Sequence, residues 1–280
     1  MDERRQRIPE AQRPHASGFA EVSGTQLYYE EAGAGHPLVL IHGGLLTNHA
    51  WDEQVPVFAQ RYRVIRYDVR GHGLSTMPPA PYSNHRDLYD LLRFLQIDQG
   101  YVLGHSMGGR IALNLALAYP EMVDALILVG AGVDGYPFSD AVDKRHEEMR
   151  AAHQRGDVDA AAEIFLQLWV DGPRRTPEDV GPAVRWRTRE MAMHNLMLPP
   201  ARGIPEPLEP AAASRLNEIH CPTLVIVGDQ DVPDILSIAD LLEHGIAGSR
   251  TAVIPGAGHM VSLEQPEAFS RVVLNFLSEL

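Results

Sequence analysis

The chain has 280 residues, which suits one large or two smaller domains and allows most apolar surface to be buried without disulfides or metals. Hydrophobic residues make up 45% of the chain and charged residues 22%, which excludes disordered, collagen-like and coiled-coil classes. The formal net charge of −13 repels phosphate backbones. We therefore expect neither a nucleic-acid partner nor a polyanionic substrate.

Three features of the sequence bear on the compartment. No apolar run approaches the length of about 18 residues that a membrane-spanning helix needs, so no membrane association is expected. The N-terminus is charged and lacks the apolar stretch of a secretory signal, and we interpret residues 1–17 as a flexible tail. The single cysteine, Cys221, cannot form an internal disulfide and is expected to be a small buried hydrophobe. These features predict a cytoplasmic protein.

Predicted strands and helices alternate along most of the chain. A hairpin is expected from residues 19–22 and 26–31 around a Ser-Gly-Thr turn. Further strands are expected at 38–41, 63–68, 101–103, 125–129, 223–227 and 251–254. Helices are expected at about 48–60, 84–97, 107–119 and 265–279. This alternation predicts an α/β fold with a mostly parallel, eight-stranded sheet that is flanked by helices on both faces.

The alternation stops between Gly135 and Ala213. This stretch is helical, proline-rich and irregular, and it contains no clear buried strand. We therefore predict a core formed by residues 18–134 and 214–280, interrupted by a helical cap at 135–213.

A Gly-x-Ser-x-Gly pattern at residues 104–108 follows an apolar strand and begins a helix. The pattern alone is weak, but this position is the one that a nucleophile elbow requires. The turn has no room for side chains two residues before and after the serine, which explains Gly104 and Gly108. We expect Ser106 to have a strained backbone and a projecting hydroxyl. The helix that starts at Met107 would direct free N–H groups at a bound oxyanion.

A serine hydroxyl needs a base, and the base needs an orienting acid. His259 lies in a loop between the last predicted strand and the closing helix, so it is the candidate base. His220 and His244 lie beside a strand start and at a helix end, where a solvated or capping histidine is a sufficient explanation. His105 adjoins the serine, but neighbours in a strand-to-helix turn point apart, and we interpret it as structural.

Asp231 is the candidate acid because it comes just after the strand at 223–227. Asp229 and Asp234 are nearby rivals, and Asp134, after the preceding strand, is a more distant one. With Asp231, the order along the chain is serine, aspartate, histidine, which is the order of the α/β-hydrolase triad.

From about residue 19 to 280 the chain resembles an α/β-hydrolase fold enzyme. The segment Ile41-His-Gly-Gly44 resembles the oxyanion loop of this family, which implies that Gly44 and Met107 donate the two backbone N–H groups of an oxyanion hole. Trp51 resembles a tryptophan that is often found on the following helix.

Two further blocks extend the resemblance. Residues 67–75 resemble the D-x-R-G-x-G-x-S signature, which implies scaffold roles for Asp68, Arg70 and His72. Residues 255–267 resemble the C-terminal histidine block of the family.

The subfamily is less well determined, because one fold supports many reactions. Ser106 argues against haloalkane dehalogenases and epoxide hydrolases, which have aspartate at the elbow. C–C bond hydrolases typically follow the histidine with tryptophan, where this chain has Met260, and the Gly-Pro run of their oxyanion loop is missing. Enol-lactonases and perhydrolases often carry G-x-S-M-G-G, as residues 104–109 do, and carboxylesterases share nearly all the motifs.

The predicted cap is rich in Met, Leu and Trp, and caps of this kind cover an active site. The residues expected to line the substrate pocket are Leu45, Trp169, Met193, Met197 and Met260. Such a pocket suits a small or medium, apolar or aromatic substrate.

The thirteen histidines show no metal-ligand spacing, and the glycines at 104–109 do not match a dinucleotide fingerprint. No metal and no cofactor is expected. The sequence thus predicts a serine hydrolase of carboxylic esters with small to medium, apolar or aromatic groups, with lactone or C–C bond hydrolysis as alternatives. A small-molecule receptor with the same fold is the non-enzyme alternative. The sequence leaves open whether the protein forms a homodimer.

Overall fold

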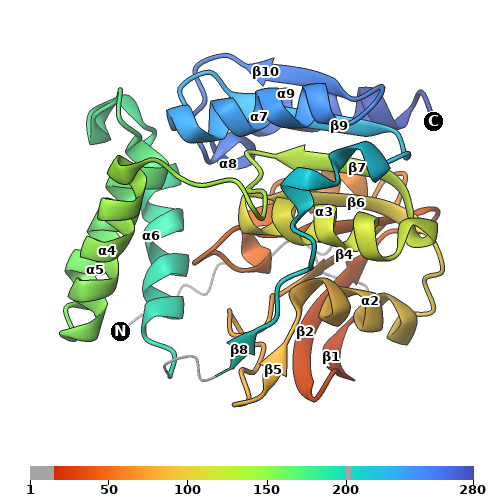
Figure 1. Cartoon of the computed structure of the whole chain (residues 1–280), viewed down its shortest axis with the longest axis horizontal. Coiled ribbons are helices and arrows are strands. Elements are labelled where there is room, and N and C mark those ends of the chain that lie inside the picture. Colours follow the sequence, from red (N-terminus) through yellow and green to blue (C-terminus); the bar gives the residue numbers. More distant parts are fainter. Residues whose placement is uncertain (1–15, 200–202) are drawn as a thin grey trace, which may run out of the picture.

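Eight strands form one sheet in the computed structural model of the chain, which describes residues 16–199 and 203–280 (Figure 1). The strands are β1 (Ala16–Val22), β2 (Thr25–Ala32), β3 (Pro37–Ile41), β4 (Arg63–Tyr67), β6 (Gly100–His105), β7 (Val123–Val129), β9 (Thr223–Gly228) and β10 (Arg250–Ile254). Their order in the sheet is β1-β2-β4-β3-β6-β7-β9-β10. The pairs β1–β2 and β2–β4 are antiparallel and all other pairs are parallel, which confirms the predicted mostly parallel sheet.

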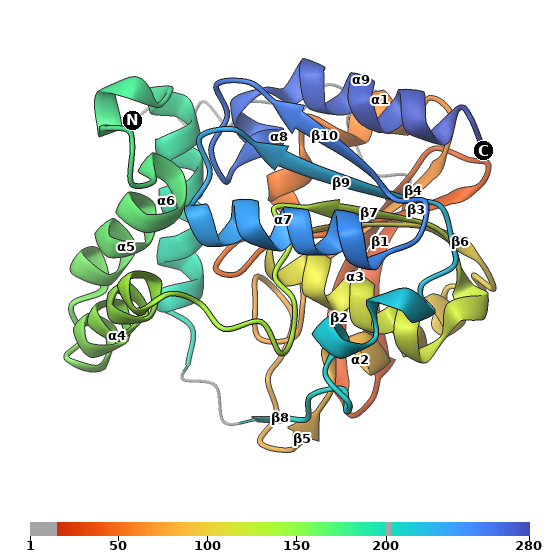
Figure 2. The same cartoon turned by 45° about the horizontal axis from the view of Figure 1, so that its top comes forward.

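Helices cover both faces of this sheet (Figures 1 and 2). One face carries α2 (Asn84–Phe94), α3 (Met107–Ala118) and α7 (Pro233–Gly245). The other carries α1 (Val55–Phe58), α8 (Val261–Glu264) and α9 (Pro266–Leu277). The parallel strands are therefore buried on both sides, as their continuous apolar runs indicate.

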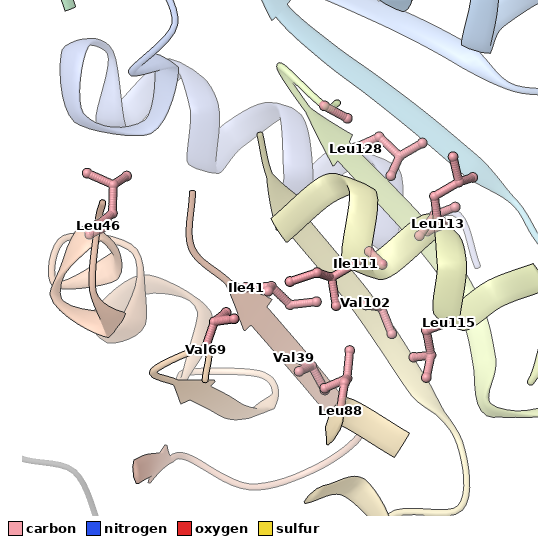
Figure 3. Close-up of a cluster of buried hydrophobic side chains, with 14 of the residues drawn as sticks. Val39, Ile41, Leu46, Val69, Leu88, Val102, Ile111, Leu113, Leu115 and Leu128 are labelled. Carbon is pink, nitrogen blue, oxygen red and sulfur yellow. The ribbon is translucent and has the colours of Figure 1, made fainter. Parts of the chain in front are cut away.

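Alternating side chains along each strand supply two separate cores. In β3, Val39 and Ile41 belong to the core that includes residues of α2 and α3, and both are labelled in Figure 3. Leu38 and Leu40 point to the opposite face and pack in the core that includes Phe269 of α9. Both cores hold the strands rigidly, so the loops at the strand ends are well positioned to carry functional groups.

The cap begins after β7 and ends before β9. It consists of α4 (Asp140–Gln154), α5 (Val158–Leu166), a π-helical segment η4 (Gln167–Asp171) and α6 (Pro182–Leu196). In Figures 1 and 2 these helices stand together beside one end of the sheet. Of the predicted tail, residues 1–15 lie outside the described residues, whereas residues 16 and 17 already belong to β1.

The block at residues 67–75 has the structural role that was expected. The Asp68 carboxylate accepts hydrogen bonds from the N–H groups of Asn48 (2.7 Å) and Leu74 (2.9 Å). Arg70 is buried and donates from Nε and Nη2 to both carboxylate oxygens of Asp87, at 2.6 and 2.7 Å. These bonds tie the loop after β4 to the loop after β3 and to α2.

The structure differs from the predicted elements at two places. Residues 48–60 form a 3₁₀ turn at Asn48–Trp51 and a separate short helix α1. A continuous helix would place Pro56 in its interior, where proline lacks a donor and its ring clashes with the preceding turn. The sequence also gave no indication of the two-residue strands β5 (Pro81–Tyr82) and β8 (Ile204–Pro205), which pair outside the main sheet.

We expect Phe269→Ala to lower the free energy of unfolding by about 3–5 kcal/mol, because it removes a fully buried ring that stacks on Trp51 with centroids 6.2 Å apart. Urea denaturation measures this loss. Phe94→Ala is the matched control because Phe94 is 49% exposed, so its loss should cost about 0.5 kcal/mol. Similar midpoints for the two variants would contradict this account of the core.

Candidate active site

Ser106 lies at the turn between β6 and α3, with φ 53° and ψ −112°. A Cβ atom at Gly104 would lie 2.1 Å from the Gly108 carbonyl oxygen, and one at Gly108 would lie 2.2 Å from the Ile41 carbonyl oxygen. Both positions are therefore restricted to glycine by the close approach of α3 to β6 and β3. The strained serine backbone that the Gly-x-Ser-x-Gly pattern predicts is present.

His259 and Asp231 form a buried pair beside this turn. The imidazole Nδ1 lies 3.1 and 3.0 Å from the two carboxylate oxygens of Asp231. Asp231 follows β9, and its Oδ1 also accepts a hydrogen bond from the Val232 N–H at 2.7 Å. Because Nδ1 donates to the carboxylate, the neutral ring keeps Nε2 as its proton acceptor.

Ser106 and His259 line one cavity of about 450 Å³ between the sheet and the cap. In the described part of the chain, the Ser106 hydroxyl has no hydrogen-bond partner. Side chains of this kind often make their functional hydrogen bonds only when a substrate is bound. The arrangement places a free hydroxyl and an imidazole that is oriented by a carboxylate around the same space.

The rival acids have other partners. Asp229 accepts a hydrogen bond from the Gly256 N–H at 2.8 Å, and Asp234 accepts from the backbone and the side chain of Ser139. Asp134 accepts from Asn114 Nδ2 at 2.7 Å. Among the four candidates, the described contacts bring only Asp231 to His259.

His42 shapes the loop that contains Gly44. Its Nδ1 donates to the Gly43 carbonyl oxygen (2.8 Å), and its Nε2 accepts from the Val69 N–H (3.0 Å). The peptide bond is trans, so the Gly44 N–H points away from the Gly43 carbonyl oxygen and from His42. Gly44 and Met107 both line the cavity, and Met107 is the first residue of α3, where N–H groups have no intrahelical partner.

His105 contacts the candidate base directly, which the sequence did not indicate. Its Nε2 lies 2.9 Å from the His259 carbonyl oxygen, and the two rings are 4.8 Å apart. Burial and the neighbouring His259 lower the pKa of His105 to about 3, so its ring is neutral at pH 7 and donates this bond. Its role is structural, as expected, but it acts on the backbone of the loop that carries His259.

Three of the five expected pocket residues line the cavity: Leu45, Trp169 and Met260. The Trp169 ring lies 4.6 Å from the His259 ring, and its other aromatic neighbours are Phe138 and His146. The cap therefore covers the candidate base with an apolar, largely aromatic wall.

The prediction that Met193 and Met197 line the pocket is wrong. Met197 is 65% exposed, and Met193 packs within the cap against the cluster that contains Ala161 and Leu196. Asn195 is one of the residues that hold α6 against the core, and its Nδ2 donates to the carbonyl oxygens of Leu45 and Leu46 at 3.0 Å each. The two methionines are each two residues from Asn195, so they lie about 200° around the helix from this contact.

A buried ion pair connects the cap with the loop of His259. Arg175 Nη1 donates to Glu264 Oε2 at 2.5 Å, and Glu264 Oε1 accepts from the Gly258 N–H at 3.0 Å. A Cβ atom at Gly258 would lie 2.0 Å from Arg175 Nη2, so only glycine leaves room for the guanidinium beside His259.

The same arginine also holds the cap segment that carries Trp169. Arg175 donates from Nη2 to the Val170 carbonyl oxygen (2.6 Å) and from Nε to the Asp171 carbonyl oxygen (3.0 Å), at the end of η4. One guanidinium thus positions both rings of the Trp169–His259 contact.

Arg174, the residue before Arg175, contacts the loop that carries Asp231. Arg174 Nη2 donates to the carbonyl oxygens of Asp229 (2.6 Å) and Asp231 (3.1 Å). Sequence reasoning missed both arginines, because their partners are mostly backbone carbonyls that only the folded chain brings near.

Comparisons with known proteins show the family of the chain. A family model described as alpha/beta hydrolase fold matches residues 36–266. The chain belongs to the α/β-hydrolase family.

Three similar proteins illustrate the reactions that are named within this family. A 2-hydroxy-6-oxo-6-(2'-aminophenyl)hexa-2,4-dienoic acid hydrolase from Metapseudomonas resinovorans is 28% identical over 93% of this chain and 90% of its own length. A thermophilic esterase from Thermogutta terrifontis is 26% identical, with a TM-score of 0.78 over 94% of this chain and 98% of that structure. The enol-lactonase from Burkholderia xenovorans is 25% identical, with a TM-score of 0.74 over 93% of this chain and 100% of that structure. The similarity to these relatives shows that the chain is a hydrolase.

No helix in the part of the chain that the structure describes is long and apolar enough to cross a membrane. Over residues 16–199 and 203–280, no group of three or more His, Cys, Asp or Glu side chains is arranged to hold a metal ion.

We expect stability to fall as the pH is lowered from about 6.5 to 5, because burial lowers the pKa of His42 to about 4 and of His105 to about 3. The unfolded chain binds protons on these histidines in this range while the folded chain does not. Each histidine therefore costs up to about 1.4 kcal/mol of unfolding free energy per pH unit. Urea denaturation at pH 7.5, 6 and 5 measures the slope.

His105→Gln should reduce this slope by about 1.4 kcal/mol per pH unit, because the unfolded variant takes up one proton fewer. A slope unaltered in His105→Gln would show that this ring is not held neutral.

We expect Arg175→Met to lower the free energy of unfolding by about 3–5 kcal/mol, because Glu264 would remain buried without its partner. Arg175→Met combined with Glu264→Leu should recover part of the loss, because the unpaired charge is then removed. Urea denaturation of both variants checks this, and a single variant within 1 kcal/mol of wild type would refute the role of the ion pair.

Proposed function

We propose that the protein is a serine hydrolase of carboxylic esters with Ser106 as nucleophile, His259 as base and Asp231 as orienting acid. The observation that carries this proposal is the buried contact of His259 Nδ1 with Asp231, at 3.0 and 3.1 Å, beside the cavity that Ser106 faces. This contact leaves Nε2 free to accept the serine proton.

The reaction follows from the roles of the three side chains. His259 takes the proton of Ser106 as its hydroxyl oxygen attacks the ester carbonyl, and Asp231 stabilises the imidazolium that forms. The protonated His259 then gives its proton to the leaving alcohol, and an acyl-enzyme remains. Water, activated by the same imidazole, attacks the acyl carbonyl and releases the acid and the free serine.

The backbone N–H groups of Gly44 and Met107 would bind the oxyanion of each tetrahedral intermediate. Removal of one such donor typically costs about 3 kcal/mol of transition-state stabilisation. The orientation of the Gly44 N–H away from His42, and the position of Met107 at the start of α3, support this assignment.

The lining of the cavity indicates the shape of the substrate. Its cap side is formed by Phe138, Met149, Phe165 and Trp169, and its volume is about 450 Å³. Such a space suits an apolar or aromatic group of small to medium size.

Lactone hydrolysis is the second candidate, because a lactone is a cyclic ester that the same groups can open. The similarity to the Burkholderia xenovorans enol-lactonase over 93% of the chain favours it. Hydrolysis of a C–C bond is favoured by the relative from Metapseudomonas resinovorans, although Met260 stands at the position where that class typically has tryptophan.

We expect the wild type to hydrolyse p-nitrophenyl esters from acetate to decanoate and Ser106→Ala to reduce kcat by at least about 10⁴-fold, because the nucleophile is lost. Release of p-nitrophenol measures both rates, and the best chain length reports the acyl space under the cap. Turnover by Ser106→Ala near that of the wild type would rule out the mechanism.

Asp231→Asn tests the acid and should reduce kcat by about 10⁴-fold, because the imidazole tautomer is no longer fixed. Asp234→Asn is the matched control, since Asp234 contacts Ser139 at the surface.

The two alternative reactions are distinguished by other substrates. An enol-lactone tests lactone hydrolysis and a vinylogous diketone tests C–C bond hydrolysis, each assayed beside the esters.

A further inference from the structure

A second cavity of about 820 Å³ adjoins the candidate active site. It shares the wall residues Leu45, Met107, Arg110 and Met149 with the first cavity. The two cavities therefore border each other at these four side chains.

The second cavity differs from the rest of the molecule in charge. Its described lining contains three arginines and two histidines but no aspartate or glutamate. These basic residues are Arg70, His72, Arg110, Arg150 and His153. On a chain with a formal net charge of −13, this lining is a local region of positive charge.

Two of these five groups are not available to a ligand as cations. The charge of Arg70 is neutralised by Asp87, which it contacts at 2.6 and 2.7 Å. Burial of the ring and the neighbouring His42 lower the pKa of His72 to about 4, so His72 is neutral at pH 7.

Of the other three, His153 donates from Nε2 to the Leu196 carbonyl oxygen at 2.8 Å. Arg110 and Arg150 are cations with donors to spare. Arg150 is exposed, and among the described residues no carboxylate lies within 4.0 Å of its guanidinium. Arg110 Nη1 lies 3.4 Å from Asp134 Oδ1, longer than the 2.7–2.9 Å of a charge-assisted hydrogen bond. The other oxygen of Asp134 is occupied by Asn114, so Arg110 keeps most of its five donors free.

Arg110 also has a fixed relation to the nucleophile. It lies one helical turn after Ser106 on α3, and its backbone N–H donates to the Ser106 carbonyl oxygen at 3.1 Å. Ser106 is the non-helical residue before α3, so the relation between the two side chains is given by the cavity and not by helical spacing: both line the first cavity, and Arg110 also lines the second. A group bound by the Arg110 guanidinium therefore lies in or beside the space that holds a carbonyl at Ser106.

We propose that this second cavity is a carboxylate-binding subsite and that the natural substrate is a monoanion, with its scissile carbonyl at Ser106 and its carboxylate at Arg110. Arg150 contributes positive charge at the same cavity. The inference rests on the proposed hydrolase function and specifies the substrate class for it. A single carboxylate is compatible with the negative net charge, because the planar guanidinium can bind it through two parallel hydrogen bonds.

The test compares two series of p-nitrophenyl esters with equal chain lengths. One series consists of the mono-p-nitrophenyl esters of succinate to suberate, and the other of the neutral esters of the corresponding monocarboxylic acids. We expect the wild type to favour the anionic ester at one or more lengths by at least 10-fold in kcat/KM. Arg110→Gln should reduce this preference at least 10-fold, mainly through KM, and should change the neutral esters less than about 3-fold.

Two variants sharpen this result. Arg110→Lys should retain part of the preference, because it keeps the charge but loses the bidentate geometry. Arg271→Gln on α9 removes one positive charge from an exposed position outside the cavity, so it should leave the preference unchanged. Equal losses in Arg110→Gln and Arg271→Gln would assign the effect to net charge and overturn the subsite.

Failure of this inference is distinguishable from failure of the proposed function. Serine-dependent hydrolysis of both series without a preference for the anionic esters overturns the subsite and leaves the hydrolase proposal standing. Absence of serine-dependent hydrolysis in both series overturns the ester-hydrolase proposal. In that case, binding of glutarate and adipate to Ser106→Ala, followed as an increase in Tm that Arg110→Gln abolishes, still tests the subsite, and no increase overturns it.

Discussion

The close contact between the first turn of α3 and the end of β3 is the constraint on which the site depends. Because Gly108 has no side chain, the helix can approach the carbonyl oxygens of Ile41 and His42. The same approach brings the loop after β3 against Ser106, since a Cβ atom at Gly43 would lie 3.3 Å from the Ser106 Cβ. The two candidate oxyanion donors, on separate elements, thereby line one cavity.

The loop of His259 is held from two independent directions. From the sheet, His105 binds the His259 carbonyl oxygen at 2.9 Å. From the cap, Arg175 binds Glu264, which in turn binds the N–H of the residue before His259. Arg174 extends the contact to the Asp231 loop, so both halves of the His259–Asp231 pair depend on the cap as well as on the core. Groups held in this way lose little freedom when a substrate is bound.

Three features could be predicted because each leaves a local signal in the sequence. The strands of the sheet are apolar runs, the turn at Ser106 is marked by a pair of glycines, and Asp231 and His259 are polar residues just after strands. The orientation of α6 could not be predicted, since it depends on contacts with distant loops, such as those of Asn195 with Leu45 and of Arg187 with Glu53. The sequence of the helix itself shows no clear apolar face, so the prediction for Met193 and Met197 is wrong. The roles of Arg174 and Arg175 could not be predicted for a similar reason. Most of their partners are backbone carbonyl groups, which every residue type has.

Two groups of cap residues have separate roles near the cavity. The side chains of Phe138, Met149 and Phe165 fill space and, in the described structure, form no hydrogen bond with the loops around Asp231 and His259. Arg174 and Arg175 hold those loops but are absent from the cavity lining. Substitutions at Met149 and Phe165 can therefore reshape the binding space without disturbing the reacting groups, whereas Phe138 also packs on Trp169, which contacts His259. The architecture favours divergence of substrate preference within one lineage, and Met149 and Phe165 are where a directed-evolution library should begin.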